Sequence, residues 1–267
     1  MLKRVLSAIV LLLLVAVCFV LSTETAMLLV AAFGILSCHE MGNALKNLNR
    51  NIIKAIPMLF IVVASLAIYF KLNMIYLMAF ACVAFVATFV ICMKSKKRTS
   101  QDALATLSTL LYPALPFIGV VYVCSLPAPK WIVIFVTGFL SAVLCDTFAL
   151  FGGMAFGKHK LAPTVSPNKT IEGSVTGSVV TTAISVGAWF LFKDYIDYSL
   201  WAFALTTAFC TVVAQIGDLS ASFIKREAGV KDFGNLIPGH GGALDRIDSM
   251  MFSIPTAYIL LTMFEGI

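Results

Sequence analysis

Long apolar runs fill most of this chain, and polar residues gather in the stretches between them. Each run approaches the roughly 20 residues that a helix needs to cross the hydrocarbon core of a bilayer. Unbroken apolar runs favour helices over the alternating pattern of a membrane β-barrel. The pattern predicts an all-α, polytopic integral membrane protein with about nine transmembrane helices, at about 5–21, 25–42, 52–70, 73–93, 103–124, 131–151, 173–192, 199–220 and 247–264.

Composition changes this picture little. Hydrophobic residues make up 60% of the chain and charged residues 12%, and the mean hydropathy is +0.98. A soluble domain carries about a quarter charged residues, so a soluble globular protein is excluded. The first run follows Lys3 and Arg4 as in a signal peptide, but no clear cleavage site follows it, and we expect a retained helix.

The basic residues predict the orientation. If the N-terminus is cytoplasmic, all of the nineteen Lys and Arg residues except Lys71, Lys130 and Lys193 fall on the cytoplasmic side. This bias follows the positive-inside rule. It accounts for the net charge of +6 without nucleic acid as a partner. We therefore expect a multi-pass protein of the cell inner (plasma) membrane, with membrane lipids as partners and an active site that faces the cytoplasm.

Ionisable residues divide the chain into two regions. Residues 1–100, with about four predicted helices, hold few charges inside the apolar runs. We interpret their exception, Glu40 beside His39, as a polar pair at the membrane interface in preference to a catalytic pair. Residues 101–267 hold about five predicted helices and two long loops. We expect the chemistry in this second region and in its cytoplasmic loops, 152–172 and 227–245.

The polar run from Ser222 to Asp248 concentrates four basic residues, four acidic residues, a histidine and five glycines. Asp218, Asp245 and Asp248 lie at two predicted helix ends that border one loop, and the last two share a helical face by their spacing. Mg²⁺ prefers a few carboxylates together with water and phosphate oxygens. The spacing of Asp218, Ser222 and Lys225 also places these three on one face of a helix.

The loop inside this run has the features of a phosphate site. Its glycines, Gly241 and Gly242 among them, let backbone N–H groups approach an anion, and the next helix adds a favourable dipole. Four basic residues supply the positive charge that phosphates need: Lys225, Arg226, Lys231 and Arg246. In a plainer alternative, the aspartates stabilise a helix start and the bases mark a cytoplasmic boundary. The gathering of the whole set in one loop favours the binding site.

A second cluster repeats the theme. Asp146 lies near the cytoplasmic end of an apolar run, where an aspartate needs a partner. Ser166, followed by Pro167, fits a helix N-cap that is followed by the first residue of a helix. That reading does not explain the nearby Lys169, Thr170 and Glu172, which favour a phosphate or nucleotide contact.

Other chemistries fit the sequence poorly. There is no nucleophile elbow, no phosphate-binding loop of the P-loop type and no dinucleotide fingerprint after a strand. The seven cysteines lack the spacing of a metal site or a disulfide framework. What remains is a metal-assisted reaction on phosphates without a covalent protein intermediate, in which positioning and charge neutralisation provide the catalysis.

The polar run also resembles a known signature, that of the phosphatidate cytidylyltransferases (CDP-diacylglycerol synthases). The matching residues are Ser222, Lys225, Arg226, Lys231, Asp232, Gly234, Pro238, Gly239, His240, Gly241, Gly242, Asp245, Arg246 and Asp248. The Asp146-Thr147-x-Ala149 and Ser166-Pro167-x-Lys169-Thr170-x-Glu172-Gly173 segments are similar to that family too, so the resemblance covers about residues 140–250.

The resemblance implies a CTP-dependent nucleotidyltransferase of phospholipid biosynthesis. It would convert CTP and phosphatidate into CDP-diacylglycerol and pyrophosphate and would require Mg²⁺, with a second metal or a monovalent cation left open. The implied metal ligands are Asp218, Asp245, Asp248 and Asp146. The implied catalytic residues are Lys225, Arg226, Lys231, His240 and Asp248, with His240 as a hydrogen-bond donor near phosphate. The implied substrate contacts are Ser166, Lys169, Thr170, Glu172, Ser222, Gly241, Gly242 and Arg246.

Two rival functions stay open. A CTP-dependent kinase of a polyprenol or another lipid alcohol would transfer the γ-phosphoryl group and release CDP. An ion-coupled transporter would use Asp146 and Asp218 as an intramembrane relay, although such charges usually lie near the bilayer midplane. The charge-poor first region also leaves a homodimer open.

Overall fold

The structure is a computed structural model, and it describes residues 22–236 and 241–265. The predicted helix at 5–21 and the candidate residue His240 lie outside this range. Helices dominate the described residues, with one small sheet. The elements are α2 (Thr23–Asn47), α3 (Ala55–Tyr69), α4 (Met74–Lys94), α5 (Ser100–Thr109), the π-helical turn η1 (Leu110–Ala114), α6 (Leu115–Cys124), α7 (Lys130–Phe156), β1 (Lys160–Ala162), β2 (Ser166–Thr170), α8 (Ile171–Phe192), α9 (Leu200–Glu227), α10 (Leu244–Ile247) and α11 (Met250–Phe264).

The predicted fold class is confirmed. Within the described ranges, seven helical segments are long and apolar enough to cross a membrane, judged by length and composition. They include α5 to α6 and α10 to α11 taken as continuous segments, while α3 is a shorter apolar helix of 15 residues. The count of nine helices and the cytoplasmic N-terminus stay predictions.

The chain forms two compact units. The first consists of residues 1–125 and 227–247, and the second of residues 126–226 and 248–267. The chain therefore leaves the first unit, forms most of the second, and returns to the first with the segment after α9. The predicted functional division near residue 100 is a different kind of boundary and stays a prediction.

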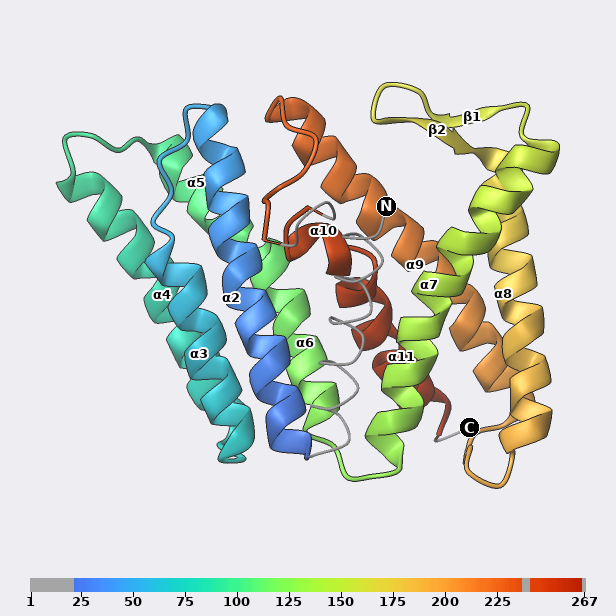
Figure 1. The fold of residues 1–267 in the computed structure, drawn as a ribbon. Coiled ribbons are helices and arrows are strands. Elements are labelled where there is room, and N and C mark those ends of the chain that lie inside the picture. The colour runs from blue at the N-terminus through green and yellow to red at the C-terminus, as the bar shows by residue number, and fades with distance from the viewer. Residues whose placement is uncertain (1–21, 237–240, 266–267) are drawn as a thin grey trace. The chain divides into compact units, whose positions relative to one another are not determined.

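In the first unit, α2 packs against α3 and α6, and α3 packs against α4 (Figure 1). Helix α2 starts at Ser22, whose side chain and that of Thr25 form a capping box. The run predicted as one helix at 103–124 is interrupted at Pro113, where η1 separates α5 from α6. Proline lacks the N–H that an α-helix would use there.

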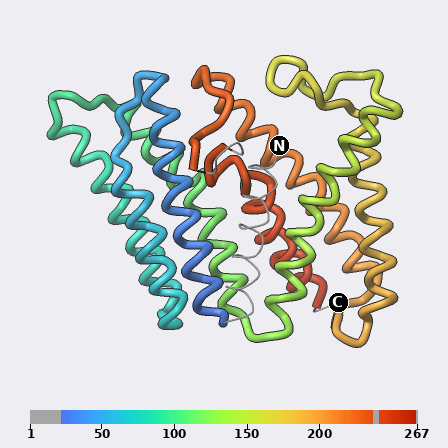
Figure 2. Tube along the Cα trace, viewed as in Figure 1, coloured from blue at the N-terminus to red at the C-terminus, as the bar shows by residue number. Residues whose placement is uncertain are grey.

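In the second unit, α7 and α8 run side by side, and the β1–β2 hairpin joins them at one end (Figure 2). Their close approach depends on small residues, because a Cβ on Gly177 would lie 2.6 Å from the backbone oxygen of Cys145. The loop predicted at 152–172 starts later than expected. Helix α7 continues to Phe156, and the remaining residues form the antiparallel hairpin that pairs Lys160 with Thr170.

The plainer alternative for Ser166, a helix cap before Pro167, is not what the structure has. Ser166 begins strand β2, where it pairs with Ala162, and this pairing keeps the backbone extended. The cap of α8 is Thr170, whose hydroxyl oxygen accepts a hydrogen bond from the N–H of Gly173 at 3.1 Å.

Helix α11 packs against α7 in the same unit. The Ser253 hydroxyl donates to the backbone oxygen of Gly138 at 2.8 Å. A Cβ on Gly138 would lie 2.5 Å from the Cα atom of Ile254, so the two backbones leave no room for a methyl group. This contact fixes the start of α11 against the middle of α7.

A pair of alanine substitutions tests this packing. Gly138→Ala is expected to destabilise the protein by about 1–3 kcal/mol, since the methyl group overpacks a backbone contact. Gly187→Ala on α8 is the matched control, because a Cβ there meets nothing within 4 Å, and the higher helix propensity of alanine would keep or raise stability. Thermal unfolding in detergent measures both. Equal midpoints for the two variants would contradict the α7–α11 contact.

Candidate active site

Helix α9 supplies the polar face on which the site is built. Asp218 and Ser222 are half-buried and Lys225 is 9% exposed, so the face predicted from their spacing is partly covered by neighbouring elements. Charged side chains in such helices are costly unless they find partners. The partners of α9 described in the next paragraphs belong to the second unit, as α9 does up to Arg226.

Gln215, one turn before Asp218, ties α9 to its neighbours. Its side-chain amide donates to the Ser178 hydroxyl at 2.9 Å and to the Cys145 sulfur at 3.2 Å, and its oxygen accepts from the Ser174 hydroxyl. These bonds connect α9 to α8 and α7. Gln215 was not among the predicted site residues, although an amide inside an apolar run is a signal of this kind of network.

Lys169 and Asp218 form an ion pair. Lys169 lies on β2, one residue before the cap of α8, and Asp218 lies on α9. Their side chains keep 30% and 22% of their surface exposed, so solvent and ligands reach both groups. The hairpin and the helix therefore bring together two residues that the sequence placed in separate clusters.

Two further aspartates lie within electrostatic range of this pair. Asp146 on α7 interacts with Lys169 and Asp218, and Asp248, just before α11, interacts with Asp218, Lys225 and Asp146. Gly217 makes this arrangement possible, since a Cβ there would lie 2.6 Å from the backbone oxygen of Asp248. Three of the four predicted metal ligands are therefore neighbours in one unit.

We call these five side chains the charged cluster: Asp146, Lys169, Asp218, Lys225 and Asp248. It sets three carboxylates against two ammonium groups, which leaves an excess of negative charge. Within the described ranges, no group of three His, Cys, Asp or Glu side chains already has the spacing of a metal site. The donor chemistry nevertheless suits a hard cation such as Mg²⁺, which keeps several waters and takes only one or two carboxylates.

Glu172 holds the hairpin in place. Its carboxylate accepts from the backbone N–H groups of Lys158 and His159, at 3.1 and 3.2 Å, and lies 2.6 Å from the Nδ1 atom of His159. Arg226 reaches the same hairpin, where its Nε donates to the backbone oxygen of Val165 at 3.3 Å. Both predicted site residues thus organise the backbone that carries Lys169.

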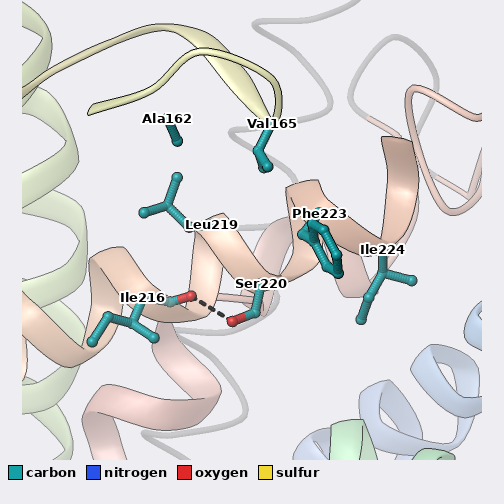
Figure 3. A pocket seen from close by; sticks show the side chains of 7 residues that line it. All are labelled: Ala162, Val165, Ile216, Leu219, Ser220, Phe223 and Ile224. Carbon is teal, nitrogen blue, oxygen red and sulfur yellow. Dashed lines mark hydrogen bonds between the residues drawn. The ribbon is translucent and has the colours of Figure 1, made fainter. Parts of the chain in front are cut away.

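An apolar groove runs between the hairpin and α9 (Figure 3). Its volume is about 350 Å³, and the stretch of α9 that lines it extends on both sides of Asp218, with Ile216 before it and Leu219 after it. The Ser220 hydroxyl donates to the backbone oxygen of Ile216 and so presents little polarity to the groove. The lining residues are Ala162, Val165, Ile216, Leu219, Ser220, Phe223 and Ile224.

The remaining described candidates, Lys231, Gly241, Gly242, Asp245 and Arg246, lie in the first unit. The Asp245 carboxylate accepts from the N–H groups of Phe233 and Gly242, at 2.8 and 3.0 Å, and so folds the segment after α9 back on itself. Gly241 has a φ of +86°, a conformation that glycine adopts at no steric cost. Lys231 and Arg246 are exposed.

The predicted shared helical face of Asp245 and Asp248 is wrong. Asp245 belongs to the single turn α10, and Asp248 with Ser249 interrupts the chain before α11 begins. The spacing of three residues holds only on a continuous helix. The interruption coincides with the point where the chain passes from the first unit to the second.

The contacts of Glu40 were also not predicted from the sequence. This side chain of α2 is 7% exposed, and it accepts hydrogen bonds from the backbone N–H groups of Ala243 and Leu244. It is therefore bound to the signature segment within the first unit. The signal in the sequence was the isolated carboxylate in an apolar run, which we had interpreted as interfacial.

The helices and the charged cluster define a polytopic membrane protein with ionisable groups gathered among its spans. Comparison with known proteins identifies its relatives. Residues 2–264 match the family described as the cytidylyltransferase family, so the chain belongs to this family.

Individual relatives agree with this assignment. The chain is 46% identical over 123 residues to a phosphatidate cytidylyltransferase of Staphylococcus haemolyticus, and 45% identical over 123 residues to proteins of the same name from Staphylococcus saprophyticus and Staphylococcus aureus. Each match covers 46% of this chain and 46% of the relative. The chain thus spans about half the length of the relatives it matches.

Substituting Glu172 tests the organisation of the hairpin. Glu172→Gln is expected to speed amide exchange at Lys158 and His159, since the neutral amide is a weaker acceptor for both N–H groups. Hydrogen–deuterium exchange read by mass spectrometry measures this. Thr164→Ala, at an exposed position of the same hairpin, serves as the control and is expected to exchange like the wild type. Unchanged exchange in Glu172→Gln would contradict the assigned contact.

Proposed function

We propose that this protein is a phosphatidate cytidylyltransferase, which converts CTP and phosphatidate into CDP-diacylglycerol and pyrophosphate. The observation that carries the proposal is the charged cluster, in which α7, β2 and α9 each contribute charged groups that the family signature also contains. Family membership and the names of the relatives support the same reaction.

The reaction needs positioned phosphates more than it needs an acid or a base. An oxygen of the phosphatidate phosphate forms a bond to the α-phosphorus of CTP. The bond between the α-phosphorus and the bridging oxygen breaks, and pyrophosphate leaves with the electron pair. Because the attacking oxygen is already ionised, the protein contributes by holding two anions together and by neutralising their charge.

The charged cluster suits this task. We assign Lys169 and Lys225 to binding phosphate oxygens, with Arg226 close to the hairpin. A magnesium ion held by Asp146, Asp218 and Asp248 would neutralise charge on the phosphate oxygens and the departing pyrophosphate. Adding its two positive charges to the cluster turns the excess of negative charge into an excess of positive charge, which favours anionic substrates.

The apolar groove supports a lipid substrate. The α9 residues that line it flank Asp218, and its lining is apolar, so a phosphatidate whose phosphate lies at the cluster would place an acyl chain along Leu219 and Phe223. We propose that the reaction takes place at the cytoplasmic face of the plasma membrane, where the predicted orientation puts these loops.

The remaining signature residues are assigned on the signature alone. We propose that Lys231 and His240 contact phosphate, that Asp245 contributes to metal binding, and that Gly241, Gly242 and Arg246 contact the nucleotide. Ser166, Thr170 and Ser222 are proposed substrate contacts from the second unit.

An assay of the purified chain tests the proposal. In detergent with CTP, phosphatidate and Mg²⁺, the expected products are pyrophosphate and CDP-diacylglycerol. Release of CDP with phosphorylation of an added polyprenol would support the lipid kinase. No turnover, together with ion flux in reconstituted vesicles, would support the transporter.

Asp248→Asn is expected to lower kcat by about a hundredfold or more, since it removes a preorganised charge from the cluster. The substitution keeps the shape of the side chain, so the variant should stay folded and membrane-inserted. Asp194→Asn, at an exposed position between α8 and α9, is the matched control and should keep wild-type activity. Near-normal turnover in Asp248→Asn would overturn the assignment of this carboxylate.

Removing divalent cations tests the proposed metal. Turnover is expected to stop when EDTA is added and to return when excess Mg²⁺ is supplied. The same treatment should leave the thermal unfolding midpoint nearly unchanged, since helix packing holds the unit together. Full activity in EDTA would exclude a required divalent cation.

A further inference from the structure

We infer that Glu40 of α2 is a positioning residue, which holds the Gly242–Leu244 part of the signature segment in its active conformation. The inference rests on the proposed function, and it adds a residue that lies about 200 positions before the segment it controls. Both partners belong to the first unit.

The two oxygens of Glu40 have separate partners. Oε1 accepts from the N–H of Ala243 and Oε2 from the N–H of Leu244, each at 2.9 Å. Hydrogen bonds to an ionised acceptor are about twice as strong as those between neutral groups. Since both oxygens are engaged, the side chain cannot rotate without losing a bond, and the segment is fixed in orientation as well as in position.

Two glycines of the signature make room for this carboxylate. A Cβ added to Gly242 or to Gly234 would collide with the Glu40 carboxylate. The backbone of the segment therefore surrounds the carboxylate closely on two sides. This contact gives a physical reason for glycine at both positions in this chain.

The arrangement links Glu40 to the charged residues of the signature. Asp245 follows Leu244 directly, and its carboxylate accepts from the N–H of Gly242. The short segment 242–244 is thus held by two carboxylates, that of Glu40 on α2 and that of Asp245 on α10. Loss of the Glu40 bonds would free Ala243 and Leu244 and would release the start of α10, which carries Asp245 and Arg246.

The burial of Glu40 argues that its carboxylate has a function, because burying a charge costs free energy. Glu40 is 7% exposed inside a helix that is apolar enough to span a membrane. Ionisable groups in such segments are expensive and are retained where they serve a function. A purely structural carboxylate would affect folding alone, and a positioning residue would also change the kinetics of the folded enzyme.

The test compares Glu40→Gln with Asp102→Asn. Asp102 is a buried carboxylate of the same unit, 4% exposed, and accepts from the N–H groups of Asn51 and Thr99 at 2.6 and 2.7 Å. It matches Glu40 in chemistry and burial, but it holds a different segment. Both variants lose a charge-assisted acceptor, so both are expected to lower the unfolding midpoint.

Only Glu40→Gln is expected to change catalysis. Per mole of folded, monodisperse protein, its kcat/KM for CTP should fall at least about tenfold, since the energy of one charge-assisted bond corresponds to a factor of this size. Asp102→Asn should keep the wild-type kcat and KM. Equal kinetics in Glu40→Gln and Asp102→Asn would overturn the inference.

A second readout does not depend on activity. Amide exchange at Ala243 and Leu244 is expected to be faster in Glu40→Gln than in the wild type and unchanged in Asp102→Asn. If the wild-type chain shows no cytidylyltransferase activity, the proposed function fails. Amide exchange at Ala243 and Leu244 would still test whether Glu40 binds these two N–H groups. If the wild type is active and Glu40→Gln leaves the exchange at Ala243 and Leu244 unchanged, the role of Glu40 is contradicted.

Gly234→Ala tests the same contact by changing the segment that surrounds the Glu40 carboxylate. Its methyl group would displace the Glu40 carboxylate, so kcat/KM should fall as in Glu40→Gln. The double variant is expected to be no worse than the more affected single variant, because both changes remove one interaction. Additive losses would show that the two residues act independently and would contradict the proposed contact.

Discussion

The structure depends on how ionisable side chains are compensated inside apolar helices. A charge that leaves water must gain a partner of opposite charge or a set of hydrogen bonds. Lys169 compensates Asp218, and the backbone of Ala243 and Leu244 compensates Glu40. Each compensated group also fixes the position of the element that carries its partner. The charged residues therefore organise the loops of the protein as well as the chemistry we propose for them.

Much of the fold follows from the apolar runs. The runs at 25–42, 73–93 and 131–151 each became one long helix, because length and hydropathy decide whether a segment spans a bilayer. The run at 103–124 was broken at Pro113, whose missing N–H acts locally. Ser166 illustrates the opposite case. Its pairing with Ala162 is a tertiary contact, and it outweighed the local preference of Ser-Pro for a helix start.

The charged residues were recognisable from the sequence, and the family resemblance implied that the aspartates share one metal site, but neither identified which side chains pair. Asp146, Lys169, Asp218 and Asp248 were all candidates, and the packing of α7, β2, α9 and the turn before α11 brings them within electrostatic range. The contacts of Glu40 were not predictable because its partners lie about 200 residues away and are backbone groups, which leave no side-chain pattern. Gln215 was missed because its contacts cross three helices.

The central claim is that the protein moves a cytidylyl group onto a lipid phosphate. The most direct measurement follows the phosphorus atoms of CTP in parallel reactions with phosphatidate and α- or γ-labelled nucleotide. We predict that the α-label appears in the lipid fraction and the γ-label in pyrophosphate. Recovery of the γ-label in the lipid fraction, with the α-label left in CDP, would contradict the account.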